Sequence, residues 1–200
     1  MMEKRHTVRK YLDKPLDMDL IGLLNDRIER NNCVYNLTFK LITNNSDGLS
    51  SLARLMSNNS VQNYIILAGK DNSDLDKKIG YCGADLILYA QSLGLNTWWC
   101  GGMFNGKNAL KHLDNKAVRV NGVIAIGYGK TQGVPHKSKT ADQVSHYKGD
   151  APEWFTSGIK ALLLAPSALN RQPYIVNGEG NKVSLKVKNG TFSQVDLGIG

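Results

Sequence analysis

The sequence predicts one domain of the α+β class, with helices and strands interspersed along 200 residues. Three observations favour this class. Some apolar residues recur at helical spacing, short apolar runs are typical of buried strands, and the order helix, strand, strand, helix occurs twice. With 42% apolar residues the chain can bury a sizeable core, so we do not expect disorder.

The first predicted helix runs from about residue 17 to residue 30. Asp17 can cap its N-terminus, and Asn31 and Asn32 are expected to end it. Its apolar residues share one face: Leu20, Ile21, Leu24 and Ile28. This spacing is typical of a helix with one side packed on a core.

Two strands and a central helix are expected next. Leu37, Phe39 and Leu41 alternate with polar neighbours, and residues 64–68 form an apolar run typical of a buried strand. The segment 80–93 is apolar nearly all round, which indicates a helix packed on several sides. Gly94 stands where a left-handed residue would end this helix.

The remaining elements alternate in the same way. Residues 97–100 are expected to be extended and to lead into two glycines, and residues 123–126 form a buried strand that ends at Gly127. Asp150, Pro152 and Glu153 resemble a helix start, and this helix should stop before Pro166. Strands are predicted at 174–176 and 183–187, with Gly178 and Gly180 in the turn between them.

The order of elements suggests a weak internal repeat. The first pass covers about residues 17–95, and a shorter pass begins near residue 150. We therefore treat the chain, residues 1–200, as one domain with half-repeats of about 1–148 and 149–200.

Composition excludes some classes of protein. No stretch approaches eighteen consecutive apolar residues, and the charged N-terminus lacks the apolar run of a signal peptide, so we expect a cytoplasmic protein without a membrane span. Cys33, Cys82 and Cys100 are odd in number and far apart, which favours reduced thiols. The four histidines show no metal-binding spacing, so no metal is expected.

The formal net charge of +8 favours an anionic ligand. Arg5, Thr7 and Arg9 offer two guanidinium groups and a hydroxyl within five residues, which suits a phosphate monoester. Lys137 and Lys139 flank a hydroxyl and are a second candidate for the same phosphate. The alternative for each segment is an ordinary solvated basic stretch. Aromatic residues are scarce among these cations, which disfavours nucleic acid.

The tract 165–173 can recognise a flat polar ring. Asn170 and Gln172 each carry a donor and an acceptor, which suits the pyrimidine edge of a flavin, and the prolines on either side would stiffen the loop. Gly101 and Gly102 would let backbone amides approach such a ring. A polar loop after a helix and a plain turn are the alternative readings.

Other motifs fail on spacing. Residues 129–131 read Gly-Lys-Thr after a strand, but the glycine that a phosphate-binding loop needs is replaced by Ile124. Ser167 has no context of a nucleophile, so no catalytic side chain is predicted.

Taken together, these segments resemble the FMN-dependent nitroreductase family over nearly the whole chain. Residues 5–11 look like the family's N-terminal phosphate-binding signature, and residues 165–173 look like its flavin-ring loop. The resemblance implies that FMN contacts these positions: Arg5, His6, Thr7, Arg9, Gly101, Gly102, Lys137, Lys139, Pro166, Ser167, Ala168, Asn170 and Gln172.

The resemblance also implies a fold and an activity. The fold would be three layers, α/β/α, with a mixed, largely antiparallel sheet. NADH or NADPH would pass a hydride to flavin N5 in a ping-pong reaction, and a nitroaromatic or quinone-like small molecule would accept it. A flavin carrier or sensor without turnover is the first alternative, and a basic nucleic-acid-binding domain is the second.

The order of the motifs departs from the family pattern. In typical members the Pro-Ser loop follows the first long helix, but residues 31–36 occupy that place here and the loop comes only after residue 164. Members are usually homodimers with FMN at the interface. The sequence therefore suggests a fused pseudo-dimer with one composite site per chain, present as a monomer or a homodimer.

Overall fold

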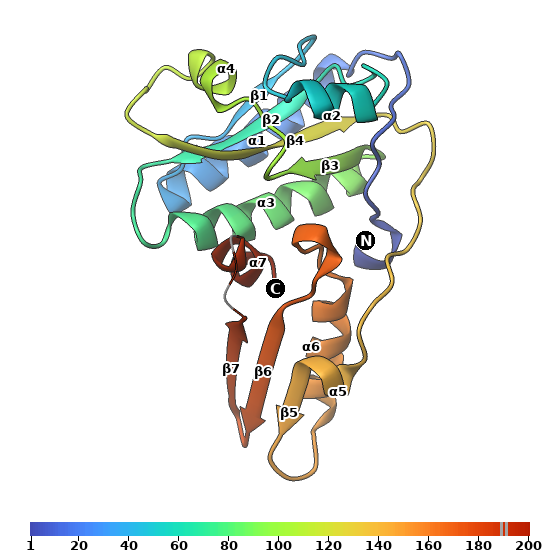
Figure 1. The fold of residues 1–200 in the computed structure, drawn as a ribbon, viewed down its shortest axis with the longest axis vertical. Helices are drawn as coiled ribbons and strands as arrows, with labels where there is room; N and C mark the ends of the chain where they lie inside the picture. The colour runs from blue at the N-terminus through green and yellow to red at the C-terminus, as the bar shows by residue number, and fades with distance from the viewer. Residues whose placement is uncertain (189, 191) are drawn as a thin grey trace.

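The structure is a computed structural model that describes residues 1–188, 190 and 192–200. It has an upper part, built from the first two thirds of the chain, and a lower part built from the rest (Figure 1). Residues 128–140 run from the upper part down to the lower one along one side. Because each part has its own sheet, we describe them in turn.

The upper sheet has four strands in the order β1-β2-β4-β3, with every neighbouring pair antiparallel. The strands are β1 (Lys40–Ile42), β2 (Tyr64–Gly69), β3 (Asn96–Cys100) and β4 (Arg119–Gly127). Every residue of β2 is buried, as the apolar run predicts for a strand covered on both faces.

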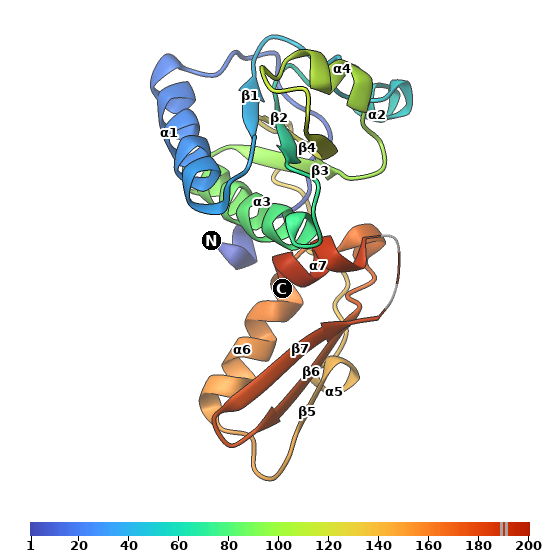
Figure 2. The ribbon, with the colours of Figure 1, turned by 90° about the vertical axis from the view of Figure 1, so that its left-hand side faces the viewer.

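Helices cover both faces of the upper sheet (Figure 2). Helices α1 (Met18–Tyr35) and α3 (Leu75–Ser92) lie on one face, and the short helices α2 (Ser51–Met56) and α4 (Gly106–Lys111) lie on the other. Successive residues of a strand point to opposite faces, so Ile65 joins the core under α1 and α3 while Ile66 joins the other core. The upper part is thus a three-layer α/β/α unit.

Helix α1 extends further than predicted. Asn31 and Asn32 do not end it, because their side chains bond other parts of the fold: Asn31 donates to Asp85, and Asn32 bonds both backbone groups of Phe39. The helix ends at Asn36, which adopts a left-handed conformation with φ 54°. The side-chain bonds of Asn31 and Asn32 thus let the helix continue, and a left-handed asparagine four residues further on ends it.

The lower sheet has three strands in the order β5-β6-β7, with β5 parallel and β7 antiparallel to β6. They are β5 (Ser145–Tyr147), β6 (Tyr174–Glu179) and β7 (Lys182–Val187). The helices of this part are α5 (Ala141–Val144), α6 (Glu153–Leu164) and α7 (Ser193–Ile199). Two 3₁₀ turns complete the chain, η1 (Met2–Lys4) and η2 (Ala168–Asn170). The α+β class is confirmed.

Some details of the lower part differ from expectation. Asp150 does not cap α6, because Pro152 itself occupies the N-cap position. Gly178 lies within β6 under the Tyr147 and Phe155 rings, so the turn is left to Gly180, whose φ is +54°. The short helices α2, α4 and α5 were not predicted, since each spans only one or two turns. None of the helices in the described residues could span a membrane.

Two glycines bring α3 and α7 into contact where the parts meet. A Cβ atom on Gly80 would collide with the carbonyl oxygen of Val195, and one on Gly198 would collide with that of Lys77. In α3, Lys77 precedes Gly80 by three positions, and in α7, Val195 precedes Gly198 by three positions. This reciprocal contact has the form of an approximate two-fold relation, and it needs glycine on both helices.

Candidate functional site

The N-terminal basic segment runs beside β3. Thr7 forms a parallel bridge with Thr97, and Val8 N donates to the Thr97 carbonyl over 3.0 Å. This pairing keeps the segment extended, so alternate residues point to the same side. Arg5 nevertheless lines a cavity with residues of α3, whereas Arg9 lies over the ring of Trp98, which belongs to the core on the other face of the sheet.

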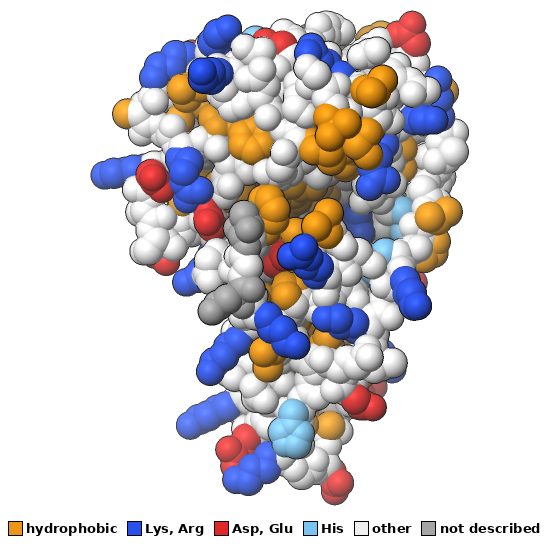
Figure 3. Space-filling view, viewed as in Figure 1, with side chains coloured by type: hydrophobic (Ala, Val, Ile, Leu, Met, Phe, Trp, Pro, Cys, Tyr) orange, Lys and Arg blue, Asp and Glu red, His pale blue; other side chains and the backbone are white. Residues whose placement is uncertain are grey.

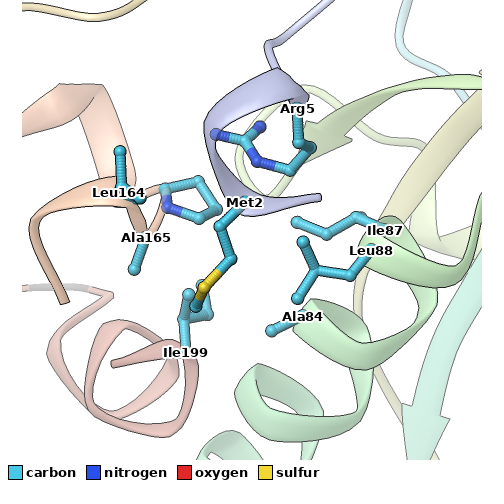
Figure 4. A pocket seen from close by; sticks show the side chains of 9 residues that line it. Met2, Arg5, Ala84, Ile87, Leu88, Leu164, Ala165 and Ile199 are labelled. Carbon is cyan, nitrogen blue, oxygen red and sulfur yellow. The ribbon is translucent and has the colours of Figure 1, made fainter. Parts of the chain in front are cut away.

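Arg5 is the buried cation of this segment, with 6% of its surface exposed. Its guanidinium extends from η1 toward the segment of residues 164–166, above a cavity of about 30 Å³ between the two parts (Figure 4). The lining is otherwise apolar and comes from both parts: Met2, Ala84, Ile87, Leu88, Leu164, Ala165, Pro166 and Ile199.

Arg5 forms no ion pair within the part of the chain that the structure describes. Burial lowers the pKa of its guanidinium, because water solvates the charge less well there than at the surface. A buried cation without a counter-ion is unfavourable in a folded protein, and an anionic ligand would offset that cost.

The other basic residues of the segment lie nearer the surface. His6 is half-buried, and burial, followed by the charges of Arg5 and His136, lowers its pKa. Arg9 is exposed, with its guanidinium carbon 5.5 Å from the centre of the Trp98 ring. Figure 3 shows Lys, Arg and His side chains on the surface where the upper and lower parts meet.

The second basic segment lies against the tract 165–173, far from it in sequence. Lys139 N donates to Gln172 Oε1 and Lys139 Nζ to the Gln172 carbonyl, both over 2.7 Å. Asn170 Nδ2 donates to the Lys137 carbonyl over 2.9 Å. The Lys139 ammonium therefore supports the turn, whereas the exposed Lys137 side chain stays available to a phosphate.

Gln172 holds the turn from within. Its side chain is fully buried, with Oε1 accepting from Lys139 N and Nε2 donating to the Leu163 carbonyl over 2.9 Å. The sequence suggested that this amide faces a flavin ring, but both of its ends are already engaged inside the protein. We therefore assign Gln172 a supporting role.

Gln172→Ala should destabilise the protein by about 1–3 kcal/mol, because Lys139 N and the Leu163 carbonyl would lose a buried partner. Urea unfolding of the apoprotein would measure this. Asn177→Ala, an exposed change on β6, is the control and should stay within about 0.5 kcal/mol of the wild type. Equal midpoints for Gln172→Ala and the control would contradict the role.

The turn between Pro166 and Gln172 has a strained backbone. Leu169, Asn170 and Gln172 have φ of 54°, 55° and 43°, in the left-handed region that non-glycine residues enter at a cost of about 1–3 kcal/mol each. Ser167 Oγ accepts from Gln172 N over 2.8 Å and closes the turn. Strain of this kind gathers at ligand-binding sites, which supports a functional reading.

The glycine loop lies across from this turn. Gly101 and Gly102 follow β3, and Cβ atoms on them would come within 3.5 and 3.6 Å of the Phe192 ring, just before α7. Ala168 N donates to Asp196 Oδ1 of α7 over 2.9 Å. The glycine loop and the strained turn thus approach the same helix, and sequence reasoning gave Asp196 no role.

A separate polar cluster lies in the upper part. His112 Nε2 is 2.9 Å from Asp47 Oδ2, and Tyr64 OH donates to Asp47 over 2.7 Å. These residues lie on the α2 and α4 side of the sheet, away from the junction with the lower part. No group of three potential metal ligands occurs among the described residues.

The fold is α+β, and Arg5 of the N-terminal segment lines one cavity with residues 164–166 of the lower part. Residues 1–200 match a family model described as "Putative TM nitroreductase", and the chain belongs to this family. No curated protein matches the sequence.

Solved structures share the fold. A "putative nitroreductase" from Thermotoga maritima is 20% identical, with a TM-score of 0.69, over 99% of this chain and 77% of that chain. A "putative nitroreductase" from Desulfovibrio desulfuricans, solved in complex with FMN, is 16% identical, with a TM-score of 0.57, over 76% of this chain and 94% of that one. A "Putative NADH dehydrogenase/NAD(P)H nitroreductase" from Parabacteroides distasonis is 19% identical, with a TM-score of 0.54, over 72% and 96%.

Proposed function

We propose that this protein is an FMN-dependent oxidoreductase that takes electrons from NADH or NADPH and passes them to a small nitroaromatic or quinone-like acceptor. The observation that carries the proposal is Arg5, a buried cation without an acidic partner among the described residues, beside the Pro-Ser segment of the lower part. Family membership and the FMN bound in the Desulfovibrio structure support it.

The residues at the junction fit FMN. Arg5 would hold the phosphate, with Thr7, Arg9 and Lys137 nearer the surface. The cavity of about 30 Å³ is too small for a flavin ring, so we propose that the ring lies outside it, between the Gly101-Gly102 loop and the turn 166–172. There the backbone groups of the glycine loop and the polar groups of Ser167 and Asn170 can bind its edge.

FMN, when bound, supplies the hydride chemistry, and the chain supplies binding and orientation. No acid or base from the protein is required for hydride transfer itself. Arg5 and the basic segment would fix the phosphate end, and the strained turn would fix the ring end. The name of the Parabacteroides structure supports a nicotinamide donor.

Purified protein should be yellow and should bleach anaerobically with NADH or NADPH, and an acceptor should restore the colour. Titration with each nicotinamide, followed by a panel of nitroaromatics and quinones, would identify the substrates. A yellow protein that neither nicotinamide bleaches would instead be a flavin carrier or sensor. Colourless protein that binds DNA with a steep salt dependence would overturn both flavin readings.

We further propose that the chain is a pseudo-dimer with one composite site. Apart from α2 and η2, which are inserted, the order α1-β1-β2-α3 recurs as α6-β6-β7-α7 and supports this, as does the reciprocal contact of Gly80 and Gly198. FMN should then saturate at about one per chain, measured by absorbance after gel filtration. Two flavins per chain, or binding only in a dimer, would contradict the proposal.

A further inference from the structure

Asp196 is a buried carboxylate that the proposed reaction does not use. Only 4% of its surface is exposed, although it lies in the first turn of α7. Burial raises the pKa of its carboxyl group, and the bond from Ala168 N together with the charge of Arg171 acts in the opposite direction. A carboxylate at this depth is unfavourable unless its interactions offset the loss of water.

The interaction of Asp196 is with the strained turn. Its Oδ1 accepts the Ala168 amide, at the start of η2 and directly before the left-handed residues Leu169 and Asn170. The other side-chain bonds that hold the turn link it to residues 136–139, to Leu163 and to Tyr174, or lie within the turn itself. Asp196 alone among these residues belongs to α7.

Helix α7 connects the turn to the upper part. Val195, next to Asp196, presents its carbonyl oxygen to Gly80 of α3. At the other end of this short segment the Phe192 ring lies beside Gly101 and Gly102. The strained turn and the glycine loop, between which the flavin ring would lie, therefore both contact residues 192–196.

We propose that Asp196 is a positioning residue. It fixes the position of the turn 166–172 relative to the Gly101-Gly102 loop, so that the turn and the loop can hold a flavin ring between them. The proposal rests on the proposed function for the identity of the ligand. The hold on the turn itself is a property of the apoprotein. This allows the two ideas to be tested separately.

Substitutions of Asp196 can distinguish the effect of its hydrogen-bond acceptor from the effects of its side-chain volume and its charge. Asp196→Asn keeps an oxygen that can accept from Ala168 N and loses the charge. Asp196→Leu keeps a similar volume and removes the acceptor, and Asp196→Ala is used if Leu prevents folding. Gln194→Ala, an exposed change on the same helix, is the matched control.

The first measurement needs no ligand. Arg171 is exposed in the turn, so native-state trypsin cleavage after it, followed by mass spectrometry, reports how firmly the turn is held. Cleavage should be on the order of tenfold or more faster in Asp196→Leu than in the wild type, since the acceptor for Ala168 N is lost. Asp196→Asn should restore most of the protection, and the Gln194→Ala control should match the wild type.

The second measurement is FMN affinity, followed by fluorescence quenching, and the visible circular dichroism of bound FMN. Asp196→Leu should weaken binding on the order of tenfold and change the dichroism, and Asp196→Asn should restore both. Equal cleavage in the wild type and Asp196→Leu, or loss of protection in Asp196→Asn as severe as in Asp196→Leu, would overturn the inference. If the wild type binds no FMN although Asp196→Leu is cleaved faster, the proposed function fails while the hold on the turn stands.

Discussion

Gly198→Ala and Gly80→Ala should each destabilise the protein by about 1–3 kcal/mol. The added methyl groups would meet the carbonyl oxygens of Lys77 and Val195, and backbone atoms cannot rotate away as a flexible side chain could. Helices α3 and α7 must then move apart. Because α7 carries Asp196, FMN binding should weaken as well. Urea unfolding of the apoprotein and FMN titration would measure the two effects.

The matched control is Gly22→Ala in α1. A Cβ atom there meets nothing within 4 Å, so the change should stabilise the protein by about 0.5–1 kcal/mol through helix propensity alone. The close packing of α3 on α7 would be contradicted if Gly80→Ala or Gly198→Ala matched this control in stability.

Arg5→Met should weaken FMN binding by about 1.5–3 kcal/mol, on the order of 10- to 100-fold in Kd, because a buried charge-assisted bond to the phosphate is lost. The apoprotein should lose no stability, since the guanidinium has no acidic partner among the described residues and its burial is unfavourable. Affinity and stability thus separate in this variant.

Two controls accompany this experiment. Arg9→Ala should weaken FMN binding less, because Arg9 is exposed and already stacks on Trp98. Arg30→Ala, an exposed change on α1, lowers the net charge equally and should leave Kd unchanged. Unaltered affinity in both Arg5→Met and Arg9→Ala would rule out the phosphate site. Isothermal titration calorimetry with FMN would give the Kd of the wild type and of the three variants.

Periodicity predicted the elements whose residues face one core. The helix face of Leu24 and Ile28, the buried strand 64–68 and the left-handed stop at Gly94 all stand in the structure. The end of α1 was missed because a distant contact engages Asn31, whose side chain bonds Asp85 of α3 instead of ending the helix. Periodicity and capping residues do not show which side chains will be engaged by contacts made elsewhere in the fold.

The candidate site shows the same division. The residue types of segments 5–9 and 165–173 were sufficient to suggest a phosphate and a ring, because those chemistries need particular donors. Residue type alone did not show whether Gln172 binds a ligand or the protein itself, since its amide can bond either, and in the structure it bonds Lys139 and Leu163. Asp196 gave no signal, because its role comes from the packing of α7 and not from a motif.

The segment 128–140, which joins the upper part to the lower one, has a kinetic and thermodynamic consequence. A site shared between separate subunits is lost when the subunits dissociate on dilution. A covalent link instead holds the two halves of the site at an effective concentration on the order of millimolar. Arg5 and Pro166, which line one cavity from opposite ends of the chain, would then stay together at nanomolar protein. The ligand affinity of this chain should be independent of its own concentration.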